Sequence, residues 1–236
     1  MAEEVKQIEI IFENDQLIAV NKPHGLLVHR TAMARDATEF ALQIVRDQIG
    51  MRVYPAHRLD RKTSGVLLFS KNETTNREIQ ALFREGRVLK HYHALVRGFT
   101  DDQGSIDYPL ETRGKKKEAI TNYHTLARYE LPISMGKFQT SRYSLVEIKP
   151  ESGRFHQIRK HFAHIFHPII GDRPHGCNKQ NRMWKENFGM TTMLLHARSL
   201  WIPYSDSEMI DIHASYSREF ERGLNIVGPY ERNMIE

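Results

Sequence analysis

The stretch 57–65, HRLDRKTSG, places one carboxylate among several cations. Arg58, Arg61 and Lys62 all lie within two residues of Asp60. Positive charge nearby favours the ionised form of a carboxylate, so this acid is suited to act as a nucleophile or a base rather than as a proton donor. The stretch by itself leaves open a second interpretation, in which the four charges form a surface ion-pair cluster at a turn.

A second charged residue with a special position is Arg159, in the segment 154–166, RFHQIRKHFAHIF, which has helical spacing. On a helical wheel, Arg159 falls between Phe155 and Phe166 inside the apolar arc. A guanidinium that faces a core is costly unless it meets an anion. Asp60 is an available partner, so we predict a buried or half-buried Asp60–Arg159 pair. The alternative is that Arg159 extends along the edge of the arc to water.

The opposite arc of this helix is predicted to be polar. Its members are His156, Gln157, Lys160, His161 and His164. No HExxH motif and no other closely spaced histidine pair with a carboxylate is present, so we do not expect a metal site. A helix face with histidine and lysine side chains fits contact with phosphates better. The glycines form neither GxGxxG after a strand nor GxxxxGK[ST], so no nucleotide cofactor is expected.

Composition gives weaker constraints. The 236 residues include 34 Lys and Arg against 29 Asp and Glu, a formal charge of +5, which is compatible with a nucleic-acid partner. A single cysteine, Cys177, can form neither an internal disulfide nor a cysteine-based zinc site, and it suits a reducing cytoplasm. The acidic N-terminus has no apolar secretory core, and no stretch approaches the ~20 apolar residues of a membrane span. We expect a soluble, cytoplasmic protein with no membrane partner.

The elements that must position these residues alternate irregularly along the chain. Segments typical of strands are 8–13, 16–23, 65–71, 88–98, 119–131, 140–150, 193–202 and 209–214. Helices are predicted at 37–50, 73–86, 154–166 and 214–223. Several connections between strands are too short for a crossover helix, which indicates an α+β fold with a mostly antiparallel or mixed sheet flanked by helices. The charged run Lys115–Lys117 is interpreted as a solvated loop or, alternatively, as a phosphate contact.

Two long motifs resemble those of the RluA-type pseudouridine synthases. They are HRLDRKTSGVLLFSKN at 57–72 and GRFHQIRKHFAHIFHPIIGD at 153–172. LIAVNKPHGLLVH at 17–29, LKHYHALVRG at 89–98 and LLHARSL at 194–200 match the family pattern in the same order. The resemblance covers nearly the whole chain and implies the pseudouridine synthase fold. It further implies one catalytic domain over 1–236 without an N-terminal S4-like RNA-binding module.

The resemblance also implies a role for five residues. Asp60 matches the catalytic aspartate, and Arg159 matches the arginine that pairs with it. Tyr92 matches the tyrosine that stacks on the target base, and Arg58 matches the arginine that fills the gap left by that base. Leu195 matches an apolar residue near the flipped base, although plain core packing explains it equally well.

The likeness is closest to a subgroup that isomerises uridine 65 of tRNA, supported by LLVHR at 26–30, IVRDQIG at 44–50 and HGCNKQNRMWKENFG at 175–189. A tRNA partner, no metal, no cofactor and a monomer are therefore expected. A relative that acts on ribosomal RNA or on another tRNA position is the alternative within the family. Outside it, a non-catalytic RNA-binding protein would not need Asp60, and a glycoside hydrolase would need a second carboxylate that no motif supplies.

Overall fold

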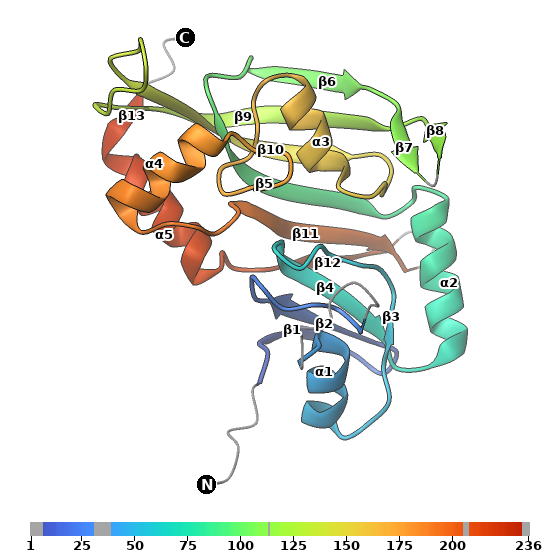
Figure 1. Ribbon diagram of the computed structural model, residues 1–236. Helices are drawn as coiled ribbons and strands as arrows, with labels where there is room; N and C mark the ends of the chain where they lie inside the picture. Colours follow the sequence, from blue (N-terminus) through green and yellow to red (C-terminus); the bar gives the residue numbers. More distant parts are fainter. Residues whose placement is uncertain (1–6, 31–38, 113, 205–207, 233–236) are drawn as a thin grey trace, which may run out of the picture. The chain divides into compact units, whose positions relative to one another are not determined.

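The computed structural model describes residues 7–30, 39–112, 114–204 and 208–232, and Figure 1 labels its helices and strands. The chain divides into two compact units, which are described separately. The first comprises Met1–Leu89 and Ala197–Ser217, and the second comprises Lys90–His196 and Arg218–Glu236. The expectation of a single catalytic domain stays a prediction. No helix in the described ranges is long and apolar enough to cross a membrane.

The first unit contains a sheet with the strand order β1-β2-β4-β11, to which β3 and β12 are added at β4 and β11. The strands are β1 (Ile10–Glu13), β2 (Leu17–Lys22), β3 (Tyr54–Pro55), β4 (Ser64–Ser70), β11 (Leu195–Pro203) and β12 (Met209–His213). The first two residues of β11, Leu195 and His196, belong to the second unit. The pairings of β1 with β2, β2 with β4, β3 with β4 and β11 with β12 are all antiparallel. The unit also contains α1 (Ala41–Ile49) and α2 (Glu73–Arg84).

The central strand of this unit is β4, whose seven residues are all buried. Its apolar run packs with the inward faces of β2, β11 and β12 and with α2 in one core cluster. Such a continuous apolar run is what a strand buried on both faces requires. Helix α2 begins where the sequence predicts, because the Asn72 side chain caps it by accepting from the Thr75 amide at 2.9 Å. Helix α1 ends where the sequence predicts, because Gly50 takes a left-handed conformation with a φ of 67°. Residues 37 and 38 of the first predicted helix lie outside the described ranges.

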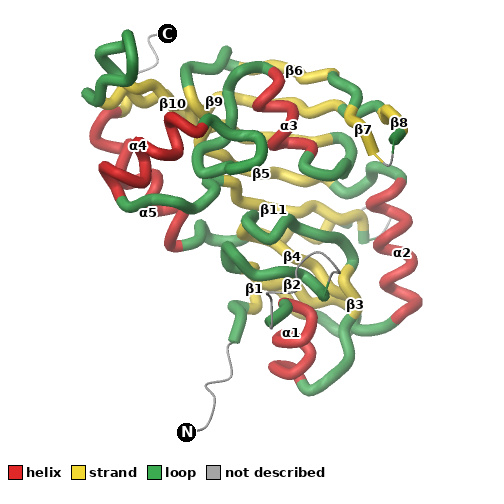
Figure 2. Tube along the Cα trace, viewed as in Figure 1, coloured by secondary structure: helices red, strands yellow, loops and turns green. Residues whose placement is uncertain are grey.

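The second unit contains the strand order β5-β10-β9-β13, with β6 paired to β9 and a separate hairpin of β7 and β8. The strands are β5 (Leu89–Arg97), β6 (Gln103–Asp107), β7 (Leu110–Thr112), β8 (Lys115–Lys117), β9 (Ile120–Leu131), β10 (Ser141–Pro150) and β13 (Glu231–Arg232). The helices are α3 (Gln157–His164), α4 (Asn178–Phe188) and α5 (Arg218–Val227), followed by the short 3-10 turn Gly228–Tyr230. Figure 2 distinguishes these strands and helices by colour.

Helix α3 lies on the face formed by β9 and β10 (Figure 1). Ile158 and Phe162 of α3 pack into a core cluster with Val146 and Ile148 of β10 and Ala94 of β5. The pairings of β5 with β10 and of β10 with β9 are antiparallel. The predicted α+β fold with a mostly antiparallel or mixed sheet is therefore confirmed.

The structure also corrects three sequence-based element predictions. The segment 154–166 forms a shorter helix because His156, at a φ of 56°, is left-handed and α3 begins only at Gln157. The last predicted helix is shifted from 214–223 to Arg218–Val227. Lys115–Lys117, interpreted as a solvated loop, forms the exposed strand β8, and the alternative that this run contacts phosphates stays a prediction. The segment 175–189, for which no element was predicted, contains α4.

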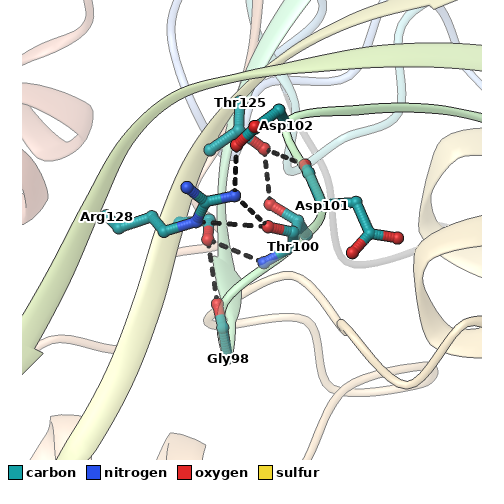
Figure 3. A network of polar contacts seen from close by, with 7 residues as sticks. Gly98, Thr100, Asp101, Asp102, Thr125 and Arg128 are labelled. Atoms are coloured by element: carbon teal, nitrogen blue, oxygen red, sulfur yellow. Dashed lines mark hydrogen bonds and ion pairs between the residues drawn. The ribbon is translucent and has the colours of Figure 1, made fainter. Parts of the chain in front are cut away.

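The connection from β5 to β6 is held by a polar network, which Figure 3 shows from close by. The Thr100 and Thr125 hydroxyls lie 2.7 Å apart, and the Thr125 hydroxyl also donates to the Asp101 carbonyl at 2.6 Å. Arg128 of β9 donates to the Thr100 carbonyl at 2.6 Å and to the Asp102 carboxylate at 2.7 Å. These bonds satisfy the backbone of a tight connection and hold β6 beside β9.

Candidate functional site

Asp60 lies in the turn between β3 and β4 of the first unit, and its side chain is half-buried. The Thr63 amide donates to the Asp60 carbonyl at 3.1 Å, which closes the turn. The Gly25 amide donates to the Arg61 carbonyl at 2.8 Å, and Arg61 Nε donates to the Gly25 carbonyl at 3.0 Å. The turn that carries Asp60 is therefore fixed against the turn that follows β2. Arg58, two residues earlier, is exposed.

The other residues of the HRLDRKTSG stretch build this turn. His57 Nε2 accepts a hydrogen bond from the Leu68 amide at 3.1 Å, and its ring stacks on Phe83 with centroids 4.9 Å apart. Gly65 has a φ of 105°, and a Cβ at this position would lie 2.1 Å from the Ala197 carbonyl oxygen. Only glycine fits there, because both the conformation and the close approach of β11 exclude a side chain.

Lys22 is a functional candidate that sequence reasoning missed. Its side chain is fully buried, and its Nζ donates to the carbonyls of Pro23 at 2.9 Å, Leu26 at 2.8 Å and Arg61 at 3.3 Å. Burial lowers the pKa of Lys22 to about 7, while the negative charge of Asp60 acts in the opposite direction. The only signal in the sequence was a lysine placed directly before the Pro-His-Gly turn.

This burial predicts a pH dependence of stability. The pKa of Lys22 is lowered from 10.5 to about 7 in the folded state, so between these pH values the unfolded chain binds more protons. The free energy of unfolding should therefore rise with pH in this window, by up to ~1.4 kcal/mol per pH unit. We expect the Lys22→Met variant to lack this contribution. Urea denaturation of the wild type and of the variant at pH 7, 8 and 9 measures this contribution. If the free energy of unfolding changed with pH in parallel in the two proteins, the role of Lys22 would be contradicted.

In the second unit, Arg159 of α3 is 5% exposed and forms a bidentate ion pair with Asp172, which is 1% exposed. Arg159 Nε donates to Asp172 Oδ2 and its terminal nitrogen donates to Asp172 Oδ1, both at 2.8 Å. The prediction that this arginine is buried against a carboxylate is therefore confirmed, but the carboxylate found here is Asp172. The predicted pairing with Asp60 joins residues of the two separate units and stays a prediction.

Part of the helical-wheel reasoning that led to Arg159 is wrong. Phe155 and Phe166, assigned to the buried arc, are 53% and 78% exposed. Both lie outside α3, because His156 and Phe166 itself are left-handed and leave the helical path. Gln157 and His161, assigned to the polar arc, are buried. A wheel over 13 residues was drawn for a helix of only eight, so the arcs near both ends were misplaced.

Gln157 and His161 of α3 both form hydrogen bonds within the second unit. Gln157 donates to the Ile120 carbonyl at 2.9 Å and accepts from the Ser152 hydroxyl at 2.7 Å. His161 Nε2 lies 3.0 Å from the Tyr108 carbonyl oxygen. The predicted phosphate-facing role of the polar arc is therefore wrong for these two side chains.

Asp172 is held in turn by α4. The Asn181 side chain donates to the Asp172 carbonyl at 2.7 Å and accepts from the Gly171 amide at 2.9 Å. A Cβ on Gly171 would lie 1.9 Å from the Thr192 carbonyl oxygen, so only glycine fits at this position of the turn. The signal for Asp172 was present in the GD that ends the second motif, whereas the role of Asn181 depends on tertiary contacts.

Helix α4 itself is anchored to the sheet by its buried face. Gln180 accepts a hydrogen bond from the Tyr143 hydroxyl of β10 at 2.7 Å. The Trp184 ring packs edge-on against Tyr143 with centroids 5.4 Å apart. These contacts make α4 a rigid support for the turn at Gly171 and Asp172.

Removing the Asn181 side chain should loosen this support. Asn181→Ala leaves the Gly171 amide and the Asp172 carbonyl without their partner, at a cost of about 1–3 kcal/mol in the free energy of unfolding. Asn187→Ala on the exposed part of the same helix is the matched control, because among the described residues the Asn187 side chain donates to the Met183 carbonyl alone. Thermal and urea denaturation measure the difference, and equal stability of the two variants would contradict the role of Asn181.

Tyr92 and Leu195 lie in the same part of the second unit. Leu195 is 3% exposed and belongs to the core cluster under α3, and Tyr92 is half-buried against that cluster. The structure therefore brings Tyr92 and Leu195 together with the helix that carries Arg159. Arg58 and Asp60 belong to the first unit. The roles of all five residues toward a base stay predictions.

Comparison with known proteins decides the family. The family model described as "RNA pseudouridylate synthase" matches residues 16–164. The chain belongs to this family. The matched part includes the Asp60 turn, Tyr92 and Arg159. The stretches 17–29, 57–72 and 89–98 lie within it, whereas the motif 153–172 extends past its end and the stretch 194–200 lies beyond it.

Relatives of this RNA pseudouridylate synthase include proteins named tRNA pseudouridine synthase C. The one from Vibrio cholerae is 42% identical over 242 residues, covering 97% of this chain and 99% of the relative. The one from Salmonella typhimurium is 43% identical over 235 residues, covering 94% and 90%. The solved structures of human RNA Pseudouridylate Synthase Domain Containing 1 and 4 each match with a TM-score of 0.71 and 23% identity, covering 92% of this chain. The matches cover 86% of the first human chain and 92% of the second. They support the pseudouridine synthase fold.

Metal ligands do not gather in the part of this synthase that the structure describes. Within the described ranges, no group of three or more His, Cys, Asp or Glu side chains is placed to hold a metal ion. His156 Nδ1 and His175 Nε2 lie 2.9 Å apart, but as a pair they bind each other.

Proposed function

We propose that this RNA pseudouridylate synthase isomerises uridine to pseudouridine in tRNA, at position 65. The observation that carries the proposal is the similarity to proteins named tRNA pseudouridine synthase C, at 42% and 43% identity over 97% and 94% of this chain. The formal charge of +5 is in keeping with a polyanionic substrate. A cytoplasmic location and a monomeric state belong to the same proposal.

The target uridine must leave its stack before it can react. Position 65 lies in a stem, where the reacting atoms are inside the duplex, and extrusion of the base costs a few kcal/mol. Stacking on Tyr92 returns about 1–3 kcal/mol of this cost. Arg58, which is exposed, occupies the space that the base vacates and contacts the phosphates beside it. Leu195 packs beside the flipped base.

Asp60 then starts the isomerisation as an ionised carboxylate. It attacks the sugar C1′, adds to the uracil ring, or removes a sugar proton to give a glycal. In each route the bond from N1 to C1′ breaks, the uracil turns in the pocket, and C5 bonds to C1′. A proton finally leaves C5, so that the product has the same atoms as the substrate. The reaction consumes no second substrate and transfers no electrons to or from the protein.

Arg159 supports this chemistry as a fixed cation. Its bidentate pairing with Asp172 leaves the guanidinium little freedom to rotate, since both oxygens of the carboxylate are used at 2.8 Å. A guanidinium that is held before the substrate arrives needs no reorganisation during the reaction. We propose that this cation acts on the ionised Asp60.

The test is incubation of the purified protein with unmodified tRNA, followed by chemical mapping of pseudouridine. We expect one modified position, 65, and no product from the same tRNA with cytidine at that position. Modification of ribosomal RNA or of another tRNA position instead would refute the assignment of the substrate. Release of free uracil would refute the assignment of the reaction.

A further inference from the structure

The second unit contains a cavity of about 440 Å³ between the turn at 171–173 and helix α4. Residues from both elements line it, among them Gly171, Arg173, Asn178, Arg182, Lys185 and Glu186. Neither the proposed catalytic residues nor the packing of the core accounts for it. Its volume is within the range of ligand sites, and most of the residues that line it end in a polar or charged group.

The spacing along α4 explains how this lining arises. Residues 178, 181, 182 and 185 follow one another at helical intervals of three, one and three, so they share one face of the helix. The buried residues Gln180, Met183 and Trp184 form the other face, which packs inward. The buried face fixes the helix, and the opposite face presents Arg182 and Lys185 one turn apart.

The cavity has a surplus of positive charge. Arg173, Arg182 and Lys185 contribute three cations and Glu186 one anion, which leaves a net charge of +2. In the described part of the chain, none of these three cations is within 4.0 Å of a carboxylate oxygen. Elsewhere in the same unit, Arg142 and Arg232 both pair with Glu130. Cations that converge on a cavity without an ion pair are arranged for an anion from outside the chain.

We propose that this cavity binds a backbone phosphate of the RNA substrate, at a site separate from the one that receives the target base. The proposal rests on the proposed function, which supplies RNA as the polyanion. Guanidinium groups from two different elements can contact two oxygens of one phosphodiester, and Lys185 adds a point charge. Because Gly171 lines the cavity and precedes Asp172, the bound phosphate lies against the turn that holds Arg159. One face of helix α4, in the 175–189 segment, therefore contacts the RNA backbone, and side chains of the same helix support the Asp172 turn.

The test compares two double variants of equal charge. Arg182→Gln with Lys185→Gln removes two cations from the cavity, and Lys137→Gln with Lys179→Gln removes two exposed cations of the same unit that do not line it. Binding of unmodified tRNA is measured from 50 to 300 mM salt. Each lost phosphate contact lowers the slope of log K against log[salt] by about 0.9, so for the single phosphate proposed here we expect the cavity variant to lose up to about 0.9 in slope and roughly 5- to 10-fold in affinity at 150 mM salt.

Further readouts distinguish a binding role from a structural one. The cavity variant should raise KM for tRNA with kcat at saturation unchanged, and it should melt like the wild type. Equal affinity and equal salt slope in the two double variants would overturn the proposal. Titration with inorganic phosphate at constant ionic strength identifies the source of the anion, because stabilisation of the wild type alone by free phosphate would assign the cavity to that ion instead.

These outcomes are independent of the test of the proposed function. A wild-type protein that modifies no uridine in tRNA, yet binds tRNA with a salt slope that depends on Arg182 and Lys185, would refute the function and retain the phosphate site. A cavity variant that modifies position 65 and binds tRNA like the control variant would refute the phosphate site and retain the proposed function.

Discussion

Replacement of Asp60 by asparagine should reduce pseudouridine formation by about 10⁴-fold or more while tRNA binding persists. The amide has nearly the same shape as the carboxylate, but it can neither attack the ribose or the base nor accept a proton from them. The turn should survive, because its closing bonds run through the backbone of Asp60, Arg61, Thr63 and Gly25. Single-turnover assays with excess enzyme measure the chemical step, and filter binding measures affinity for tRNA.

Asp47→Asn in the same unit is the matched control, since Asp47 is an exposed carboxylate on α1 that pairs with Arg46. This variant should turn over like the wild type. Turnover of the Asp60→Asn protein close to the wild-type rate would refute the assignment and would favour a protein that only binds RNA. The pKa of the buried Lys22 should fall further in Asp60→Asn, because the carboxylate that raises it is gone.

Replacement of Arg159 by alanine should cost about 3–5 kcal/mol in the free energy of unfolding and abolish activity at the same time. The cost arises because Asp172, 1% exposed, would remain as a buried carboxylate without its bidentate partner. A surface ion pair has no such effect, because water solvates whichever group remains. Urea denaturation and single-turnover assays measure the two effects.

A double-mutant cycle with Asp172→Ala separates stability from catalysis. The Arg159→Ala, Asp172→Ala protein should recover part of the stability lost in either single variant, because neither charge is then buried alone. Activity should not return, since the cation required for the reaction is still absent. The exposed pair Arg46–Asp47 provides the control cycle, for which we expect no measurable coupling. An Arg159→Ala protein that melts like the wild type would contradict the buried geometry.

Local patterns were sufficient for most strands and for the two helices of the first unit. The strand β4 was predictable because its apolar run GVLLFS is bounded by turn residues, and α2 because Asn72 and the apolar spacing after it define a helix start. Helix α3 was predicted too long, since nothing local in FHQ shows that His156 takes a left-handed conformation. Helix α4 was missed, because its segment is strongly polar. Its buried face consists of only Gln180, Met183 and Trp184, which is too few residues to show a helical apolar pattern.

The sequence by itself determined the family, the Asp60 motif, and the requirement that Arg159 meet an anion. These features depend on residue types at close spacing or on the cost of burying a charge, both of which can be read along the chain. Only the tertiary structure decided which carboxylate Arg159 binds in its own unit, which carbonyls surround Lys22, and which face of α4 lines a cavity. Such pairings join segments that are distant in sequence, and their partners are selected by the packing of the core rather than by any local pattern.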